Sequence, residues 1–384
     1  MKRLAIVTTH PIQYYAPVFQ LLAARGRIEI KVFYSWGERV RSKFDPGFAR
    51  QVSWDIPVLQ GYSYAWADNI APDPGTHHYR GIDTPGLVRQ VLDWDPDAVL
   101  VFGWSWRGHL QAMRFFKGRI PVFFRGDSTV LSGGRGVKGI MKLLFLRWVY
   151  RHVDLAFYVG SNNRAYFKKY GLRDDQLVFA PHAIDNERFR QDPAVQADEL
   201  RSSAGLKPDD MLVLFAGKFE PVKNVELLVS AFLQLNRPGV HLLLVGNGPL
   251  EDSLKAAAAG NPNIHFMDFQ NQLAMPAVYR SADLFCLPSV SETWGLAVNE
   301  AMACGRAVLV SDQVGCAADL VSAANGAVFR SGSCEDLVRQ MKELLTSRER
   351  LAAMGGRSAE TISAWNFERI AGAIEKQLGA GEKN

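Results

Sequence analysis

Short runs of apolar residues recur along the chain, and helical periodicity follows most of them. A continuous apolar run of strand length indicates a strand that is buried on both faces, as in a parallel sheet covered by helices. The runs form two series, one in each half of the chain, which predicts two doubly wound α/β domains. The first series comprises residues 4–8, 28–34, 98–102, 121–124 and 155–159, and the second comprises 211–215, 241–245, 264–267, 284–287 and 307–310.

Apolar residues spaced three and four apart predict helices between these strands. The predicted helices cover residues 18–25, 87–93, 225–236, 250–259, 273–281 and 296–304. Polar sequence with Pro193 and Pro208 separates the two series, so we place a linker near residues 182–200. We expect an N-terminal domain over residues 1–185 and a C-terminal domain over 186–362. A terminal helix at about 363–384 can pack back on the N-terminal domain.

Composition places the chain among ordinary globular proteins, with 384 residues, 48% of them hydrophobic and 22% charged. No apolar stretch reaches the roughly 18 residues of a membrane-spanning helix. The apolar run at residues 4–7 is too short for a signal peptide. Four cysteines without metal-binding or disulfide spacing favour a reducing compartment. We therefore expect a cytoplasmic protein that can associate with the inner face of the plasma membrane.

The net charge of +5 is unevenly distributed, because residues 107–151 contain ten Lys and Arg but one acid and so carry +9. Within this region, residues 136–152 have the pattern of a basic amphipathic helix with apolar and aromatic residues, which suits an anionic membrane surface. The alternative is a core helix with a solvated basic face. No nucleic-acid-binding module accompanies the charge, so we expect no nucleic-acid partner.

Two lysines follow the first strand of the second series, in the segment Gly217-Lys218-Phe219-Glu220-Pro221-Val222-Lys223. Ligands of α/β domains bind beyond the carboxyl ends of strands, and two ammonium groups there suit a diphosphate. Taken alone, the segment is equally consistent with solvated loop lysines. The glycine turn at residues 245–250 lacks a third glycine and is weak evidence for a dinucleotide site.

Two glutamates flank the start of a predicted helix in the segment 288–305. Glu292 lies in the loop after strand 284–287, and Gly295 and Leu296 begin the helix, where backbone N–H groups can bind phosphate oxygens. Glu300 lies about one turn into that helix. Carboxylates in this arrangement can accept paired hydrogen bonds from sugar or ribose hydroxyls.

These segments resemble glycosyltransferase family 4, the retaining nucleotide-sugar transferases of GT-B fold. Glu292 and Glu300 match the Glu-x7-Glu motif of that family, and Gly217, Lys218 and Lys223 match its basic loop with mild departures. The run from Pro181 to Phe189 matches a further motif. The resemblance covers residues 155–330 and implies two Rossmann-like domains facing across a cleft.

The resemblance also implies roles for individual residues. Lys218 and Lys223 would bind the diphosphate of a UDP- or GDP-sugar, Glu300 the ribose, and Glu292 the sugar, so we count Lys218, Lys223 and Glu292 as catalytic. Similar enzymes need no metal, and the DxD pattern at residues 93–97 is interpreted as a polar turn. The remaining donor-site candidates are Thr293, Trp294, Gly295, Leu296, Phe269 and Gln270.

The N-terminal domain would bind the acceptor through loops that follow its strands. His10, Gln13 and Tyr14 follow the first strand, Trp104 and Trp106 the third, and Arg125 and Asp127 the fourth. We count His10 and Asp127 as catalytic candidates. The glycine-rich loop and the histidine that many relatives carry here are absent, which leaves the proton-transfer residue open. The +9 region suggests a glycan acceptor linked to a polyprenyl diphosphate or another lipid.

The expected function is transfer of a sugar from a nucleoside-diphosphate sugar to a glycan or lipid-linked glycan, in bacterial cell-surface polysaccharide or glycolipid synthesis. Two alternatives stay open. One is a nucleotide-sugar epimerase or a phosphorylase on the same fold. The other is a non-catalytic protein that binds nucleotide sugars.

Overall fold

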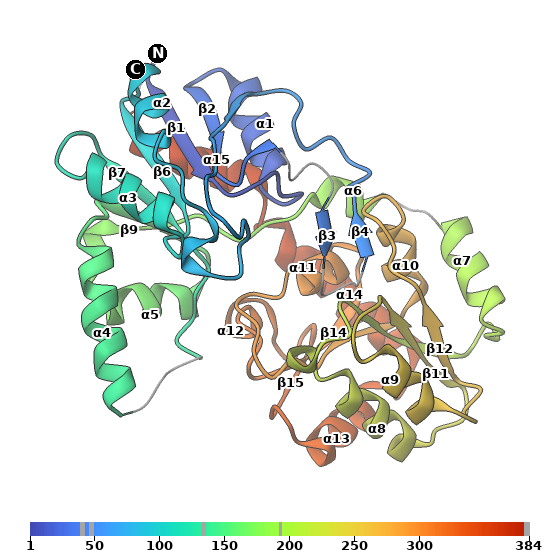
Figure 1. Cartoon of the computed structure of the whole chain (residues 1–384). Coiled ribbons are helices and arrows are strands. Elements are labelled where there is room, and N and C mark those ends of the chain that lie inside the picture. The colour runs from blue at the N-terminus through green and yellow to red at the C-terminus, as the bar shows by residue number, and fades with distance from the viewer. Residues whose placement is uncertain (39–42, 46–49, 132–135, 192–193, 380–384) are drawn as a thin grey trace. The chain divides into compact units, whose positions relative to one another are not determined.

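The computed structural model describes residues 1–38, 43–45, 50–131, 136–191 and 194–379. The chain divides into two compact units (Figure 1). The first unit comprises Met1–Lys43, Ile56–His182 and Phe367–Asn384, and the second comprises Phe44–Asp55 and Ala183–Asn366. The second unit thus includes a short segment, 44–55, from within the expected N-terminal domain. The first unit takes its last helix from the C-terminal end of the chain.

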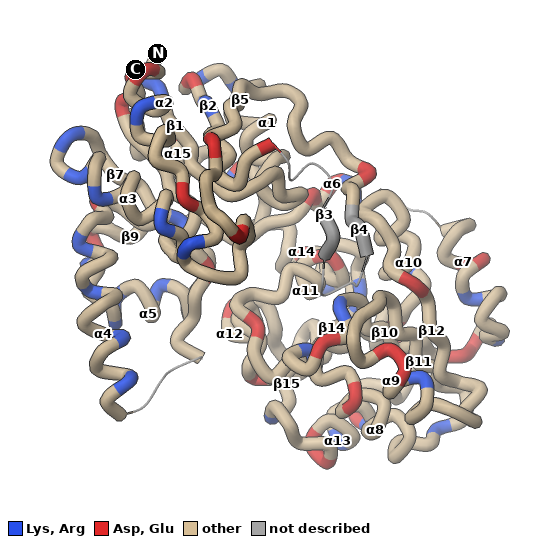
Figure 2. The backbone as a smooth tube through the Cα atoms, viewed as in Figure 1, with Lys and Arg blue, Asp and Glu red and all other residues tan. Residues whose placement is uncertain are grey.

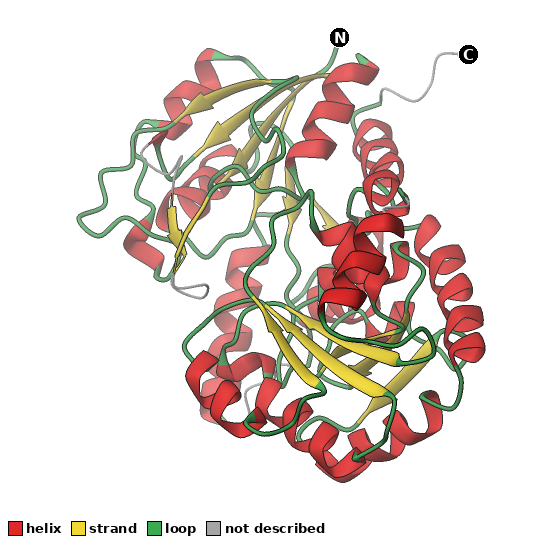
Figure 3. Ribbon diagram, turned by 90° about the vertical axis from the view of Figure 1, so that its right-hand side faces the viewer, coloured by secondary structure: helices red, strands yellow, loops and turns green. Residues whose placement is uncertain are grey.

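The first unit is built on a seven-stranded parallel sheet in the order β5-β2-β1-β6-β7-β8-β9. Its strands are β1 (Arg3–Thr8), β2 (Glu29–Tyr34), β5 (Ser63–Trp66), β6 (Ala98–Phe102), β7 (Val122–Arg125), β8 (Leu155–Tyr158) and β9 (Leu177–Phe179). Its helices are α1 (Ala16–Arg25), α2 (Leu87–Asp93), α3 (Arg107–Phe116), α4 (Val137–Tyr150), α5 (Ser161–Lys169) and α15 (Phe367–Gln377). The central strands β1, β6 and β7 are buried along almost their whole length because helices cover both faces of the sheet (Figure 3).

The second unit is built on a six-stranded parallel sheet in the order β12-β11-β10-β13-β14-β15. Its strands are β10 (Met211–Ala216), β11 (Val240–Val245), β12 (Ile264–Met267), β13 (Leu284–Leu287), β14 (Ala307–Ser311) and β15 (Gly326–Phe329). Its helices are α6 (Asn186–Arg190), α7 (Ala194–Ser203), α8 (Val225–Leu235), α9 (Glu251–Ala258), α10 (Met275–Ser281), α11 (Leu296–Ala303), α12 (Ala317–Leu320), α13 (Cys334–Leu344) and α14 (Arg348–Ser363). A separate two-stranded sheet pairs β3 (Lys43–Asp45) with β4 (Arg50–Val52).

The predicted pair of doubly wound α/β domains is confirmed, and every predicted strand is present within two residues of its expected bounds. The expected linker, in contrast, contains α6 and α7. Phe189 of α6 is fully buried, so this segment is part of the second unit's core. No described helix is long and apolar enough to span a bilayer.

Strand order reverses at one point in each sheet. In the second unit β10 lies between β11 and β13, and in the first unit β1 lies between β2 and β6. The loops leaving the two neighbouring strands at such a point diverge to opposite faces and open a crevice beyond the carboxyl ends of the strands. Ligand-binding residues are therefore expected after β10 and β13 in the second unit, and after β1 and β6 in the first.

Candidate active site

The loops after β10 and β13 meet in the second unit. The Val290 N–H donates to the Val222 carbonyl at 2.9 Å, and the Lys223 ammonium forms an ion pair with the Glu292 carboxylate. The Lys223 and Glu292 side chains are 22% and 17% exposed, so both remain within reach of a ligand. Lys218 lies half-buried on the same β10 loop. The structure therefore brings two groups predicted from separate motifs, a phosphate-binding lysine and a sugar-binding glutamate, into direct contact.

The Glu292 loop is held against the loop after β14. The Glu292 N–H donates to Gln313 O at 3.1 Å, and the Gly315 N–H donates to Glu292 O at 3.0 Å. A Cβ atom on Gly315 would lie 1.9 Å from the Thr293 carbonyl oxygen, so only glycine allows this approach. These contacts hold the backbone of the Glu292 loop in place, and the carboxylate itself pairs with Lys223.

Helix α11 begins at this loop. Gly295 precedes it with φ of 96°, a left-handed conformation that favours glycine, and a Cβ there would lie 3.0 Å from a Val314 methyl group. The Gly295 and Leu296 amides lie at the helix N-terminus, where N–H groups have no partner within the helix and can bind an anion. Glu300, further along α11, is 4% exposed and accepts a hydrogen bond from the Tyr279 hydroxyl at 2.7 Å.

The loops after β11 and β12 join the same edge of the sheet. Gly246 lies so close to the β10 loop that a Cβ would be 1.9 Å from the Gly217 carbonyl oxygen. The Phe269 N–H donates to the Asn247 side chain at 2.9 Å, which fixes the start of the β12 loop. Gln270, the next residue, is half-buried and donates to the Asp268 carbonyl. Phe269 and Gln270 thus lie at the same edge of the sheet as Lys218, beyond the carboxyl ends of the strands.

Trp294 lies away from this edge. Its side chain is 3% exposed, its indole N–H donates to Asn299 at 2.9 Å, and its ring lies 5.2 Å from that of Trp365. The Trp294 side chain therefore packs in the core of the second unit, beneath the loop that carries Glu292. The neighbouring Thr293 is exposed. A direct contact between the Trp294 ring and a donor, as expected from the sequence, does not fit this burial.

The acceptor-side candidates of the first unit are distributed over three loops. His10 contacts the Thr9 hydroxyl at 2.9 Å and the edge of the Trp36 ring, and Gln13 and Tyr14 are half-buried. Trp106 donates from its indole N–H to Thr76 O, and Trp104 packs edge-on against Phe145.

Arg125 has a structural role. The residue is 4% exposed, and its guanidinium donates to the Ala180 and Pro181 carbonyls at 2.9 and 2.8 Å. The expectation that Arg125 binds the acceptor conflicts with these hydrogen bonds. Burial, reinforced by the positive charge of Arg125 and opposed by Asp127, lowers the pKa of His182 to about 4. His182 therefore provides a neutral imidazole in this part of the first unit.

Two residues of these sites, His182 and Tyr279, were not selected from the sequence. His182 belongs to the Pro181–Phe189 motif, and its ring stacks on Tyr15 with 6.2 Å between centroids, so the motif could have indicated it. Tyr279 lies in α10, and no pattern in the sequence connects it with Glu300. Such a contact between two helices appears only once both pack on the same sheet.

Covalent catalysis by a buried thiol does not fit the structure. Burial raises the pKa of Cys304 to about 12 and the pKa values of Cys286 and Cys316 well above that of an ordinary thiol. Within the described part of the chain, the one group of side chains spaced for a metal ion is Asp73, His77 and His78 in the first unit. In the DxD segment, Asp97 instead accepts a hydrogen bond from the Arg3 N–H at 2.8 Å.

A protein-family model matches most of the second unit. Residues 196–361 match the family model described as "Glycosyl transferases group 1". A D-inositol 3-phosphate glycosyltransferase of Nocardia farcinica is 31% identical over 55% of this chain and 49% of its own length. A GDP-mannose-dependent alpha-(1-6)-phosphatidylinositol monomannoside mannosyltransferase of Mycobacterium tuberculosis is 28% identical over 65% of this chain and 69% of its own. The chain spans about half the length of the first curated relatives it matches.

Solved structures match the whole chain. Sucrose-phosphate synthase from Thermosynechococcus elongatus has a TM-score of 0.74 at 18% identity, with 100% of both chains covered. Anabaena HepE in complex with UDP-glucose has a TM-score of 0.71 at 16% identity, over 99% of this chain and 100% of that one. These similarities establish the fold as GT-B, with two Rossmann-like domains. Residues 196–361, which carry the paired glutamates and the basic loop, are thus the part of the chain that matches the glycosyl transferases group 1 model.

Proposed function

We propose that this protein is a retaining glycosyltransferase that moves a hexose from a UDP- or GDP-sugar to a hydroxyl of a lipid-linked or phosphorylated acceptor, without a metal ion. The observation that carries the proposal is the contact between Lys223 and Glu292 at the switch point of the second sheet. A cation for the diphosphate and a carboxylate for the sugar stand next to each other there, beside the N-terminus of α11. In a nucleoside-diphosphate sugar, the anionic diphosphate would lie against Lys223 and the hydroxyls of the adjoining sugar against Glu292.

In the proposed reaction, the bond between the anomeric carbon and the diphosphate oxygen breaks while the acceptor oxygen bonds to that carbon on the same face. The acceptor's hydroxyl proton passes to the departing phosphate oxygen, so no covalent intermediate forms. Lys218 and Lys223 stabilise the charge that develops on the leaving diphosphate. Glu292 orients the sugar hydroxyls, and the buried Glu300 accepts hydrogen bonds from the ribose.

The names of the relatives favour a particular acceptor class. Two of them act on inositol 3-phosphate or a phosphatidylinositol mannoside, and one uses GDP-mannose. Both acceptors carry phosphate, and one is a lipid. A phosphorylated or lipid-linked acceptor would also fit the +9 charge of residues 107–151 in the first unit. We place the enzyme in glycolipid or cell-surface polysaccharide synthesis.

Helix α4 supports a membrane-bound acceptor. Its apolar residues recur at intervals of three and four on one exposed face, which is typical of a helix lying in a lipid interface. Lys138, Lys142 and Arg147 lie along the same helix, and Figure 2 shows its basic positions. The exposed apolar residues are Val137, Ile140, Met141, Leu144 and Phe145, with 74, 60, 66, 63 and 44% of their surface accessible. We propose that this face binds an anionic bilayer on the cytoplasmic side.

A donor screen tests the transferase proposal. UDP-, GDP-, ADP- and dTDP-sugars are added to the protein in EDTA, and thermal stability and release of nucleoside diphosphate are measured. One nucleotide family should stabilise the protein, since a ligand that binds only the native state raises its apparent stability. Absence of any shift would contradict the proposal, and conversion of the sugar to an epimer without acceptor would favour an epimerase.

Substitution of the basic loop tests the mechanism. Lys218→Ala should lower turnover by about 10²–10³-fold, the range seen when one group that stabilises transition-state charge is removed. Lys255→Ala is the matched control, because Lys255 lies in the same unit, is 51% exposed and pairs with Glu251 within α9. Near-normal turnover in Lys218→Ala, with the fold intact, would rule out the assigned role.

Vesicle binding tests the role of α4 separately. Ile140→Ser with Leu144→Ser should abolish cosedimentation with vesicles of phosphatidylglycerol while leaving donor binding unchanged. Val195→Ser is the control, because Val195 is 68% exposed but lies on α7 of the second unit. If all variants bind vesicles equally, α4 is not the membrane contact. If the wild type is a dimer and the double variant is not, the apolar face of α4 instead binds a second copy of the chain.

A further inference from the structure

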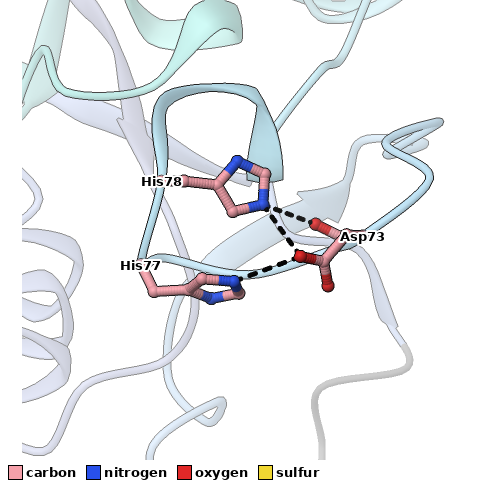
Figure 4. A group of neighbouring side chains, drawn as sticks. All are labelled: Asp73, His77 and His78. Carbon is pink, nitrogen blue, oxygen red and sulfur yellow. Dashed lines mark hydrogen bonds and ion pairs between the residues drawn. The ribbon is translucent and has the colours of Figure 1, made fainter.

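A second group of chemically active side chains lies in the first unit, in the loop between β5 and α2. Asp73, His77 and His78 point toward one another (Figure 4). The Nε2 atoms of His77 and His78 each lie 3.2 Å from the same oxygen, Oδ2 of Asp73. All three ligand atoms are within 4.8 Å of one another. None of these residues takes part in the proposed transfer reaction.

The spacing fits a metal ion. Two ligand atoms that each lie about 2.0–2.1 Å from a tetrahedral zinc ion are about 3.3 Å apart, close to the separations between each imidazole nitrogen and the carboxylate oxygen. Imidazole and carboxylate together suit zinc and its neighbours among the divalent transition metals, whereas magnesium and calcium prefer oxygen ligands alone. The combination of two imidazoles and one carboxylate therefore favours zinc and similar divalent transition metals.

The loop backbone is already fixed in the conformation that gathers the three side chains. Gly75 and Gly81 are joined by a hydrogen bond of 3.0 Å, and the Gly81 N–H donates to His78 O at 3.1 Å. The Asn69 side chain donates to Gly81 O at 2.9 Å and accepts from the Asp83 N–H at 2.9 Å. Because these hydrogen bonds already order the loop, metal binding would cost little additional conformational entropy of the chain.

Gly75 has a specific place in this arrangement. A Cβ atom on Gly75 would lie 2.4 Å from both Nδ1 and Cε1 of His77, so the His77 ring rests directly on the glycine backbone. Any larger residue must push the imidazole aside. The absence of a side chain at residue 75 therefore allows His77 to face Asp73.

We propose that Asp73, His77 and His78 form a binding site for one divalent transition-metal ion of the zinc class, with its remaining coordination positions open to solvent or to a ligand. Each imidazole would bind the ion through Nε2 as a neutral ring that carries its proton on Nδ1. His77 is 65% exposed and Asp73 is 74% exposed, so the ion is exchangeable. The loop contacts Trp106 through Thr76 O, which connects the site to one acceptor-side candidate.

The test is titration of the whole protein, prepared without a histidine tag, with Zn²⁺ by calorimetry and with Co²⁺ by visible absorption. Wild type should bind one equivalent, with a Co²⁺ spectrum of low coordination number, and Mg²⁺ should not compete. His77→Ala and His78→Ala should each weaken binding by about 10–100-fold or more. Gly75→Ala, which keeps all three ligands, should weaken it as well.

His265→Ala is the matched control, because His241 and His265 form the other close histidine pair of the described residues, with 3.0 Å between ring nitrogens. Its Zn²⁺ affinity should equal that of wild type. Absence of stoichiometric binding, or loss of binding in His265→Ala but not in His77→Ala, would overturn the proposal. Neither readout requires transferase activity, so failure of the metal site leaves the proposed function untouched.

Discussion

In the candidate donor site, the Tyr279 hydroxyl donates a buried hydrogen bond to the Glu300 carboxylate. Tyr279→Phe removes a bond to a charged acceptor, and such bonds contribute about 1.5–3 kcal/mol. We expect nucleotide affinity to fall by about tenfold, because the freed carboxylate is no longer held in place. Calorimetry with the preferred nucleoside diphosphate and its 2′- and 3′-deoxy analogues checks this. If Glu300 holds the ribose, the variant and the deoxy analogue should show non-additive losses. Additive losses would mean that Glu300 acts elsewhere.

His109 gives a second prediction at this scale. It is fully buried, contacts the Ser35 hydroxyl at 2.6 Å and lies 3.0 Å from the Gly103 carbonyl through Nδ1. Burial lowers its pKa to about 4, although the backbone contacts oppose the shift. The unfolded chain therefore binds a proton below about pH 6.5 that the folded chain takes up only near pH 4.

Stability should consequently fall as the pH drops through this window, by about 2 kcal/mol from His109 at pH 5. Urea unfolding of the wild type at pH 7.5 and pH 5 measures the loss. His109→Gln cannot titrate, so its stability should change by correspondingly less between the two pH values. Equal losses in the two proteins would show that the folded protein protonates His109 normally.

At the scale of elements, the contact between the β13 and β14 loops positions α11. Gly315→Ala would put a Cβ against the Thr293 carbonyl, so we expect a loss of about 1–3 kcal/mol and a weaker response to the donor. Gly356→Ala in α14 is the control, since a Cβ there meets nothing within 4 Å and alanine favours a helix by about 0.5–1 kcal/mol. Urea unfolding measures both. A Gly315→Ala protein as stable as wild type would mean that the loops move apart without cost.

Buried elements were easier to predict from the sequence than partly exposed ones. Central strands such as β1 and β10 were predicted because both faces are covered and the apolar run is unbroken. Of the edge strands, β12 was predicted, whereas β5, β9 and β15 were not; β9 has three residues, and β5 and β15 are partly exposed. Helix α5 was missed because its sequence is largely polar and buries three residues.

At the scale of the whole molecule, the chain returns to its first unit at the C-terminal end. Helix α15 packs on α1, where Glu375, with 2% of its side chain exposed, pairs with Arg25 at 3.0 Å and with Arg27 at 3.3 Å. Glu375→Ala removes a buried carboxylate that accepts from two partly exposed arginines, and it should cost about 1.5–3 kcal/mol. Glu368→Ala is the control, because Glu368 contacts the same Arg25 but is 66% exposed and should cost under about 1 kcal/mol.

Hydrogen exchange of α1 and β1 amides, together with limited proteolysis of α15, measures the effect within the first unit. Glu375→Ala should accelerate exchange there and leave β10 and β11 unchanged, since those strands belong to the second unit. Identical behaviour of Glu375→Ala and Glu368→Ala would indicate that the ion pairs do not hold the helix.

The sequence by itself determined the two parallel-sheet domains and the grouping of Lys218, Lys223, Glu292 and Glu300 as donor-site candidates, because strand burial and local spacing are recorded in adjacent residues. Only the tertiary structure decided which residues meet across elements. It paired Lys223 with Glu292, placed Tyr279 against Glu300, turned Trp294 into the core and committed Arg125 to backbone carbonyls. These contacts depend on the order of strands in each sheet, which brings distant loops to one edge and which no local pattern specifies.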